Sequence, residues 1–201
     1  MAAMSVFLQA CRAEPTPYTP IWLMRQAGRY QPEYRAIRSK VSFVELCRRS
    51  DLAAEVTLLP VTQLGVDAAI LFADILLILE PLGIGFEFQG DGPHIARPVR
   101  SGADVDRVVE HIDAANSLGY VLETVRQVRA GLPAGIPLIG FAGAPFTLAS
   151  YAIEGGGSKE YRHTKTLMYR DEGAFRALMH KLTSACIDYL NAQIANGAQA
   201  I

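Results

Sequence analysis

Two arginines four residues apart are the most informative pair in this chain. Arg25 and Arg29 lie in the segment Met-Arg-Gln-Ala-Gly-Arg-Tyr, with Gly28 between them. A guanidinium is always charged and presents forked donors that match a carboxylate or a phosphate, and a glycine lets a ligand approach the backbone closely. The spacing therefore predicts an anion-binding loop. The alternative is a pair of surface arginines that form ion pairs with Glu33 and Glu45.

A carboxylate follows the first strongly apolar run. Residues 67–74 form an apolar run bracketed by two acids, Asp67 and Asp74, which is typical of a strand buried on both faces. We expect Asp74 at the end of this strand, between Phe72 and Ile75, in an apolar setting that strengthens its bonds to a donor or a cation. The alternative is an acid that only caps the following segment.

Composition excludes several classes of protein. The chain has 201 residues, 50% hydrophobic content and a net charge of −1, which suits a globular domain and argues against a nucleic-acid or membrane-surface binder. The cysteines, Cys11, Cys47 and Cys186, are odd in number and lack zinc spacing, so we expect a reducing cytoplasm and no metal site. No apolar run reaches the roughly 20 residues of a membrane-spanning helix.

Apolar spacing predicts a series of helices. The expected ranges are 33–40, 42–64, 103–112, 118–132, a short helix from 146 that carries Tyr151, and 159–196 with a break near 171–173. We expect the helices within 33–64 to lie on the surface, with Asp51 as the N-cap of one that runs toward Leu59. The Gly155-Gly156-Gly157-Ser158 segment predicts a hinge or tight turn, because it lacks the Gly-Lys-Ser/Thr ending of a phosphate loop.

Apolar runs between these helices predict strands. Residues 67–74 and 136–145 read as buried strands, and 197–201 as the start of a third. Residues 83–88 predict an extended segment that ends in a turn over 89–93. Helices that alternate with buried strands indicate an α/β protein with a parallel sheet, either doubly wound or barrel-shaped.

Three blocks resemble the uroporphyrinogen decarboxylase family and occur in its order. They are MRQAGRY after Pro-x-Trp, FADIL around Asp74, and PLIGFAGAPFTLASY leading to EGGGS. The resemblance implies a (β/α)8 TIM barrel that acts as a homodimer when full length, with its cleft at the carboxyl ends of the strands. Since a barrel takes about 250 residues, we expect residues 1–201 to be a C-terminally truncated domain with the first two to three β/α units. The family's later Ser and His have no counterpart here, and Gln31 stands where an apolar residue is common.

The resemblance also implies a reaction and its residues. Members of the family remove carbon dioxide from the four acetate arms of uroporphyrinogen III, giving coproporphyrinogen III in porphyrin and haem biosynthesis, without a metal or organic cofactor. Asp74 and Arg25 are then the catalytic candidates, and Asp74 would accept hydrogen bonds from the pyrrole N–H groups. The candidate substrate-binding residues are Arg25, Gln26, Ala27, Gly28, Arg29, Arg38, Asp74 and Tyr151.

Two other functions fit parts of the sequence. A related cobalamin-dependent methyltransferase would hold zinc through His and Cys, and the MRQAGRY segment argues against it. A non-catalytic fragment that binds a tetrapyrrole is the other alternative. Without the resemblance, Tyr151 would be interpreted as a helix tyrosine with an anchored hydroxyl.

Overall fold

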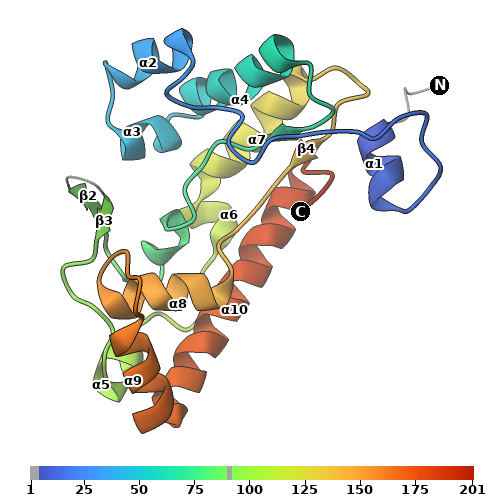
Figure 1. Ribbon diagram of the computed structural model, residues 1–201. Helices are drawn as coiled ribbons and strands as arrows, with labels where there is room; N and C mark the ends of the chain where they lie inside the picture. Colours follow the sequence, from blue (N-terminus) through green and yellow to red (C-terminus); the bar gives the residue numbers. More distant parts are fainter. Residues whose placement is uncertain (1–4, 90–91) are drawn as a thin grey trace. The chain divides into compact units, whose positions relative to one another are not determined.

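The computed structural model describes residues 5–89 and 92–201, which divide into two compact units. Unit 1 is drawn from Met1–Asp74, Gly119–Phe141 and Leu190–Ile201, and unit 2 from Ile75–Leu118 and Ala142–Tyr189. Figure 1 colours the chain along its sequence. The turn predicted over 89–93 includes Gly90 and Asp91, which lie outside the described residues.

Unit 1 combines helices with a short parallel sheet. Its elements are α1 (Val6–Cys11), α2 (Pro32–Arg38), α3 (Phe43–Arg48), α4 (Ser50–Leu64), β1 (Ala69–Ile70), α7 (Gly119–Gly131), β4 (Leu138–Ile139) and the end of α10 (Glu172–Ala195). The helix predicted over 118–132 is confirmed as α7. No helix in the described part of the chain is long and apolar enough to cross a membrane.

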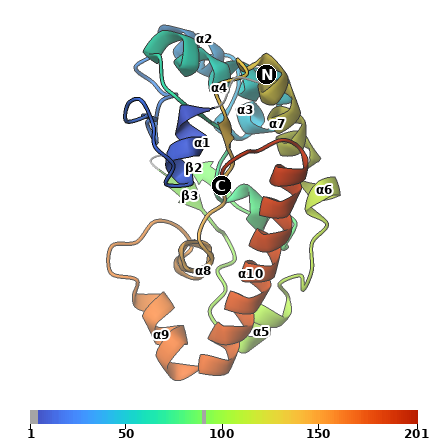
Figure 2. The same cartoon turned by 90° about the vertical axis from the view of Figure 1, so that its right-hand side faces the viewer.

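Helix α4 has one buried and one exposed side. It packs along α7, as both views show (Figures 1 and 2), and buries Ala53, Val56 and Val61. The prediction of a surface helix is confirmed for α4, which buries one side against α3 and α7 and exposes Asp51, Glu55 and Gln63 on the other. The N-cap prediction was wrong: Arg49, with extended backbone, precedes the helix, and Asp51 lies in its first turn. There the Asp51 carboxylate forms an ion pair with Arg49 at 2.6 Å. Its negative charge is also stabilised by the positive N-terminal end of the helix dipole.

The predicted parallel sheet is present, but its strands are shorter than expected. Ala69 pairs with Leu138 and Ile70 with Ile139, and Ala200 makes a parallel bridge to Ile139. The third predicted strand is therefore a single bridge.

Side chains end these strands early. The N–H of Phe72 bonds the Thr57 hydroxyl at 3.0 Å instead of a neighbouring strand. At Phe141, the Gln193 amide accepts from the N–H at 3.0 Å and donates to the C=O at 2.9 Å. The strands predicted over 67–74 and 136–145 are thus limited to two residues each.

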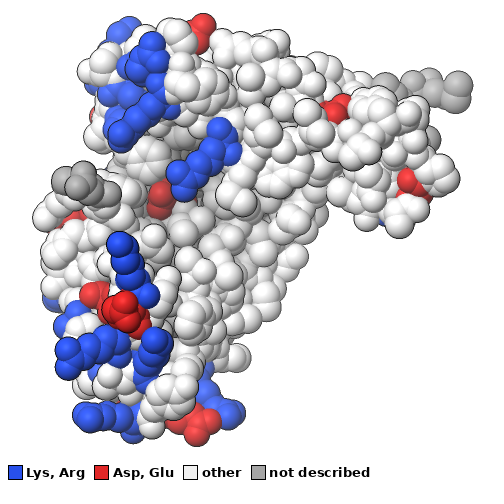
Figure 3. Space-filling model, in the orientation of Figure 1, with Lys and Arg blue, Asp and Glu red and all other residues white. Residues whose placement is uncertain are grey.

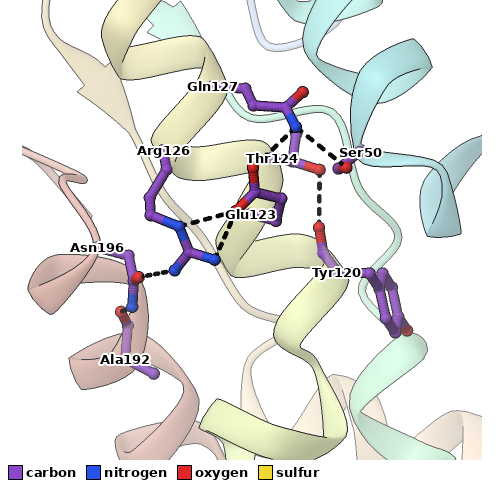
Figure 4. Close-up of polar contacts among 8 residues, drawn as sticks. All are labelled: Ser50, Tyr120, Glu123, Thr124, Arg126, Gln127, Ala192 and Asn196. Carbon is purple, nitrogen blue, oxygen red and sulfur yellow. Dashed lines mark hydrogen bonds and ion pairs between the residues drawn. The ribbon is translucent and has the colours of Figure 1, made fainter.

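Polar side chains fasten α7 to its neighbours within unit 1 (Figure 4). Gln127 donates to Ser50 at 3.3 Å and to Glu123 at 2.9 Å. Arg126 pairs with Glu123 at 2.6 Å and also donates to Asn196, beyond the end of α10. These bonds connect α7 to both the start of α4 and the C-terminal segment.

Unit 2 consists mainly of helices. Its elements are the 3-10 helix Leu77–Leu79, β2 (Glu87–Gln89), β3 (Gly92–His94), α5 (Gly102–Asp106), α6 (Ala114–Ser117), α8 (Pro145–Glu154), α9 (Arg162–Arg170) and most of α10. Strands β2 and β3 pair antiparallel. The helix predicted over 103–112 was too long, since α5 ends at Asp106. The buried Lys181 ammonium donates hydrogen bonds to the carbonyls of Val105 and Val108 at 3.1 and 2.7 Å, so these carbonyls have a partner outside α5. Helix α6 was not predicted.

Helix α8 ends as the glycines predict. Gly155 is left-handed, with φ 88°, and closes the helix. The Arg100 guanidinium donates to the carbonyls of Ile153 and Glu154, both at 3.0 Å, so these last carbonyls have partners. The break predicted near 171–173 is also present, since α9 ends at Arg170 and α10 begins at Glu172.

Gly140 offers a test of packing at the sheet. A Cβ there would lie 2.5 Å from Gln193 Oε1 and 3.1 Å from the Ala198 Cβ, and Gln193 is fully buried and bonded at both ends of its amide. We expect Gly140→Ala to lower the free energy of unfolding by about 1–3 kcal/mol through overpacking.

Urea denaturation would measure the effect. Gly85→Ala is the matched control, because nothing lies within 4 Å of a Cβ at that exposed position. Equal stability of the two variants would contradict the packing argument.

Candidate functional site

The two arginines lie on a loop of unit 1 that other side chains hold in place. Arg25 and Arg29 are both exposed. Within residues 5–89 and 92–201, neither guanidinium forms a hydrogen bond or an ion pair, so the alternative pairs with Glu33 and Glu45 do not form. Both cations are therefore available to an anion.

Gln26 and Gly28 are fixed by backbone contacts. The Gln26 amide is 1% exposed; it accepts from the Leu23 N–H and donates to the Ala68 carbonyl, both at 3.2 Å. The Gly28 N–H donates to the Gln31 side chain at 3.1 Å. Since its amide is already occupied at both ends, Gln26 holds the loop through its side chain.

An apolar cluster joins this loop to the segment that carries Asp74. Tyr34, Leu46 and Val56 form its centre, and Ala27 and Phe72 pack against it. The Phe72 ring makes an edge contact with Tyr34, with centroids 5.9 Å apart. One cluster thus supports both Ala27, which lies between the two arginines, and Phe72, which lies two residues before Asp74.

Arg38 lies on helix α2, which also carries Tyr34 of this cluster. Its guanidinium is 5.8 Å from the centroid of Phe43 and donates to the Val41 carbonyl. Figure 3 shows basic side chains gathered over the α2–α3 end of unit 1, where α2 contributes Arg35 and Arg38. Arg38 is half-buried and already bonded, so it is less available to a ligand than Arg25 or Arg29.

Asp74 is half-buried and follows the end of β1 by four residues. The charges of Asp74 and Arg38 both affect the buried Cys47 thiol. Burial and then the Asp74 charge raise the pKa of this thiol to about 12, while the Arg38 charge lowers it. Both charges are therefore close enough to the Cys47 thiol to affect it. All the predicted site residues except Tyr151 belong to unit 1.

Tyr151 lies on α8 in unit 2 and lines a small cavity of about 170 Å³. The wall is Phe146, Thr147, Ser150, Tyr151, Gly156, Gly157, Ser158 and Tyr161. Tyr161 has a left-handed backbone, with φ 51°, and its N–H bonds the Ser158 hydroxyl at 3.0 Å. The glycine segment is a tight turn, as predicted, and it also forms part of a hydroxyl-rich cavity, which the sequence did not indicate.

Comparison with known proteins identifies the family. The model of one family, uroporphyrinogen decarboxylase (URO-D), matches residues 2–201. The chain belongs to the uroporphyrinogen decarboxylase family. Proteins named uroporphyrinogen decarboxylase are 58% identical over 196 residues in Carboxydothermus hydrogenoformans and 55% identical over 196 residues in Sorangium cellulosum.

The match covers part of each relative. It takes in 97% of this chain and 56% of either relative, so the chain spans about half the length of these members of the uroporphyrinogen decarboxylase family. A solved structure, a methyltransferase from Methanosarcina mazei, is 19% identical with a TM-score of 0.76, over 97% of this chain and 57% of that one. At this identity the likeness supports the α/β fold alone. The described residues hold no group of three or more His, Cys, Asp or Glu that could bind a metal ion.

Thr57 fixes the start of the Asp74 segment. Its hydroxyl is buried, donates to Ala53 at 2.8 Å and accepts from the Phe72 N–H. We expect Thr57→Val to speed hydrogen exchange at the Phe72 amide by about tenfold or more, because a buried N–H without a partner costs about 1–3 kcal/mol. Thr57→Ser keeps the hydroxyl and should leave this amide protected. Equal exchange in the two variants would contradict the assignment.

The buried thiols should resist alkylation. Burial raises the pKa of Cys186 to about 11, as it raises that of Cys47 to about 12, while Cys11 is exposed. At pH 8, iodoacetamide should modify Cys11 and spare the other two in the folded chain, as mass spectrometry of peptides would show. Modification of Cys47 before unfolding would contradict its burial.

The same shifts make stability depend on pH. Above the ordinary thiol pKa of 9.0, an unfolded chain loses these protons and the folded chain keeps them. Stability should therefore fall as pH rises from about 9 toward 12. Urea denaturation of wild type and Cys47→Ala at pH 7.5 and 10 should show a smaller fall in the variant.

Proposed function

We propose that this chain supplies part of the active site of a uroporphyrinogen decarboxylase. The reaction replaces carbon dioxide by a proton on each of four acetate arms of uroporphyrinogen III and gives coproporphyrinogen III. One observation supports this proposal most directly. The family match over residues 2–201 includes the loop with Arg25 and Arg29, whose exposed guanidinium groups have no partner within the described residues.

The substrate sets what the site must provide. A reduced tetrapyrrole bears eight carboxylates around four pyrrole N–H groups, so cations are needed at its rim and an acceptor at its centre. Arg25 and Arg29 would bind carboxylates through charge-assisted hydrogen bonds. Asp74 would accept hydrogen bonds from the pyrrole N–H groups. Tyr151 would donate its hydroxyl to a further carboxylate, and the cavity beside it has room for one acetate or propionate arm.

Decarboxylation needs a place for an electron pair. When a proton adds to the pyrrole carbon next to the acetate arm, the ring becomes cationic. The C–C bond to the carboxylate then breaks and releases carbon dioxide, and its electrons neutralise the ring as an exocyclic methylene forms. This methylene takes up a proton to become the methyl group, and the ring carbon releases the proton it first gained, which restores the pyrrole. A carboxylate beside the ring, such as Asp74, lowers the free energy of the cationic state in a site of low dielectric.

Arg25 is the better candidate for binding than for proton delivery. A guanidinium has a pKa above about 12 and is a poor acid. Its charge can nevertheless hold the reacting acetate until the proton has been transferred to the ring. Gln26, Ala27 and Gly28 would contribute through their backbone positions, and Arg38 through its charge.

The fold proposal follows the same family. We place β1, β4 and the bridge at Ala200 as the first neighbouring strands of a (β/α)8 barrel, because they are parallel and follow one another in chain order with helices between them. Residues 1–201 would then form the first two to three β/α units of a uroporphyrinogen decarboxylase domain. A homodimer of the full-length protein and a cytoplasmic location are further predictions from the family.

Turnover of uroporphyrinogen, followed by chromatography of the oxidised porphyrins, tests the proposal. The 201-residue chain is compared with a chain extended to the length of its relatives. We expect coproporphyrin from the extended chain. Product from neither chain would refute the function, and binding of the tetrapyrrole without product would favour a non-catalytic role.

Variants of the extended chain test the roles of the residues. Asp74→Asn should lower kcat by about 10²–10³-fold, the usual loss when one preorganised charge-stabilising group is removed. Asp51→Asn is the matched control, since Asp51 is an exposed acid on α4. Arg25→Ala should mainly raise KM, with Arg12→Ala as control. Wild-type kcat in Asp74→Asn would exclude the central role of this carboxylate.

A further inference from the structure

We infer that Gln31 and Gln63 are positioning residues that hold the Gly28 peptide, and with it the two flanking arginines, in the conformation that binds anionic substrate. The inference rests on the function proposed above. It concerns side chains that would not touch the substrate themselves.

The contact begins at the peptide between the arginines. Gln31 Oε1 accepts from the Gly28 N–H at 3.1 Å, and Gln31 Nε2 donates to Gln63 Oε1 at 2.7 Å. Gln63 lies in the last turn of α4, and its side-chain amide is close enough to the Glu33 carboxylate on α2 to affect that group. The pKa of Glu33 is lowered first by a backbone N–H and then by this amide. A line of hydrogen bonds therefore runs from the Gly28 peptide through Gln31 to Gln63 on α4.

Burial makes this line selective for one loop conformation. Gln31 is only 2% exposed, and an amide removed from water costs free energy unless its donor and acceptor are both satisfied. Here both ends of the Gln31 amide have partners. If the loop moved, the amide and the Gly28 N–H would lose their bonds together.

A second set of bonds holds the rest of the loop. Gln26 binds the Leu23 N–H and the Ala68 carbonyl, and Arg35 donates to the Arg29 carbonyl at 2.8 Å. None of these bonds uses the Arg25 or Arg29 guanidinium. The backbone is thus fixed while both cations stay available.

This arrangement matters because the loop lacks regular structure. No helix or strand includes Leu23–Tyr30, so helix or sheet hydrogen bonds do not order it. Ordering a mobile loop upon binding would reduce affinity, whereas a loop that is already ordered avoids that cost. Gln31 would therefore affect substrate affinity more than its distance from the ligand suggests.

Gln31→Leu tests the inference in the 201-residue chain. It keeps the size and burial of the side chain but removes both hydrogen bonds. We expect faster hydrogen exchange at the Gly28 amide and about tenfold weaker binding of uroporphyrin, the stable oxidised octacarboxylate, as the loss of one such bond implies. Gln63→Leu removes only the second contact and should weaken binding less.

Gln127→Leu is the matched control. It makes the same substitution in unit 1 and also removes two hydrogen bonds, but on α7 (Figure 4). A purely structural role for Gln31 predicts that both variants lose stability and keep wild-type affinity, which would overturn the inference. Weaker binding in Gln31→Leu alone supports it.

The exchange measurement separates this inference from the proposed function. If wild type binds no uroporphyrin, the proposed function and the substrate role of the loop both fail. Gly28 exchange that is unchanged in Gln31→Leu overturns the positioning role even when wild type binds well. Faster Gly28 exchange with weaker binding supports both.

Discussion

Buried backbone groups must be hydrogen-bonded, and unit 1 meets this demand largely with side chains. Its strands are only two residues long, so most of the neighbouring backbone lies outside the sheet. Thr57 binds Phe72, Gln193 binds Phe141, and Gln26 binds Ala68. Each buried polar side chain specifies one conformation of the segment it binds, and the candidate site lies on two of these segments.

The apolar cluster of Tyr34, Leu46 and Val56 makes these segments depend on one another. Ala27 and Phe72, which are far apart in the sequence, both pack against it. In a closely packed interior, a displacement of one side chain is passed on to its neighbours. The arginine loop and the Asp74 segment therefore share a support that involves neither charge.

The sequence predicted well the features that depend on local signals and poorly those that depend on distant contacts. The amphipathic pattern gave α7, and Gly155 gave the end of α8, because both signals are local. The strand lengths were wrong because the partners that end the strands, Thr57 and Gln193, are far away in the chain. Motif resemblance supplied the candidate site residues, but nothing near Gln31 revealed its bond to Gln63, 32 residues later.

Gln193 has a consequence for association between molecules. A side-chain amide carries the same donor and acceptor as a peptide group, so at Phe141 it occupies both backbone groups that a neighbouring strand would need. Unpaired strand edges are where chains join into aggregates. A single glutamine thus closes the sheet at this residue, and a foreign strand would have to begin its pairing elsewhere.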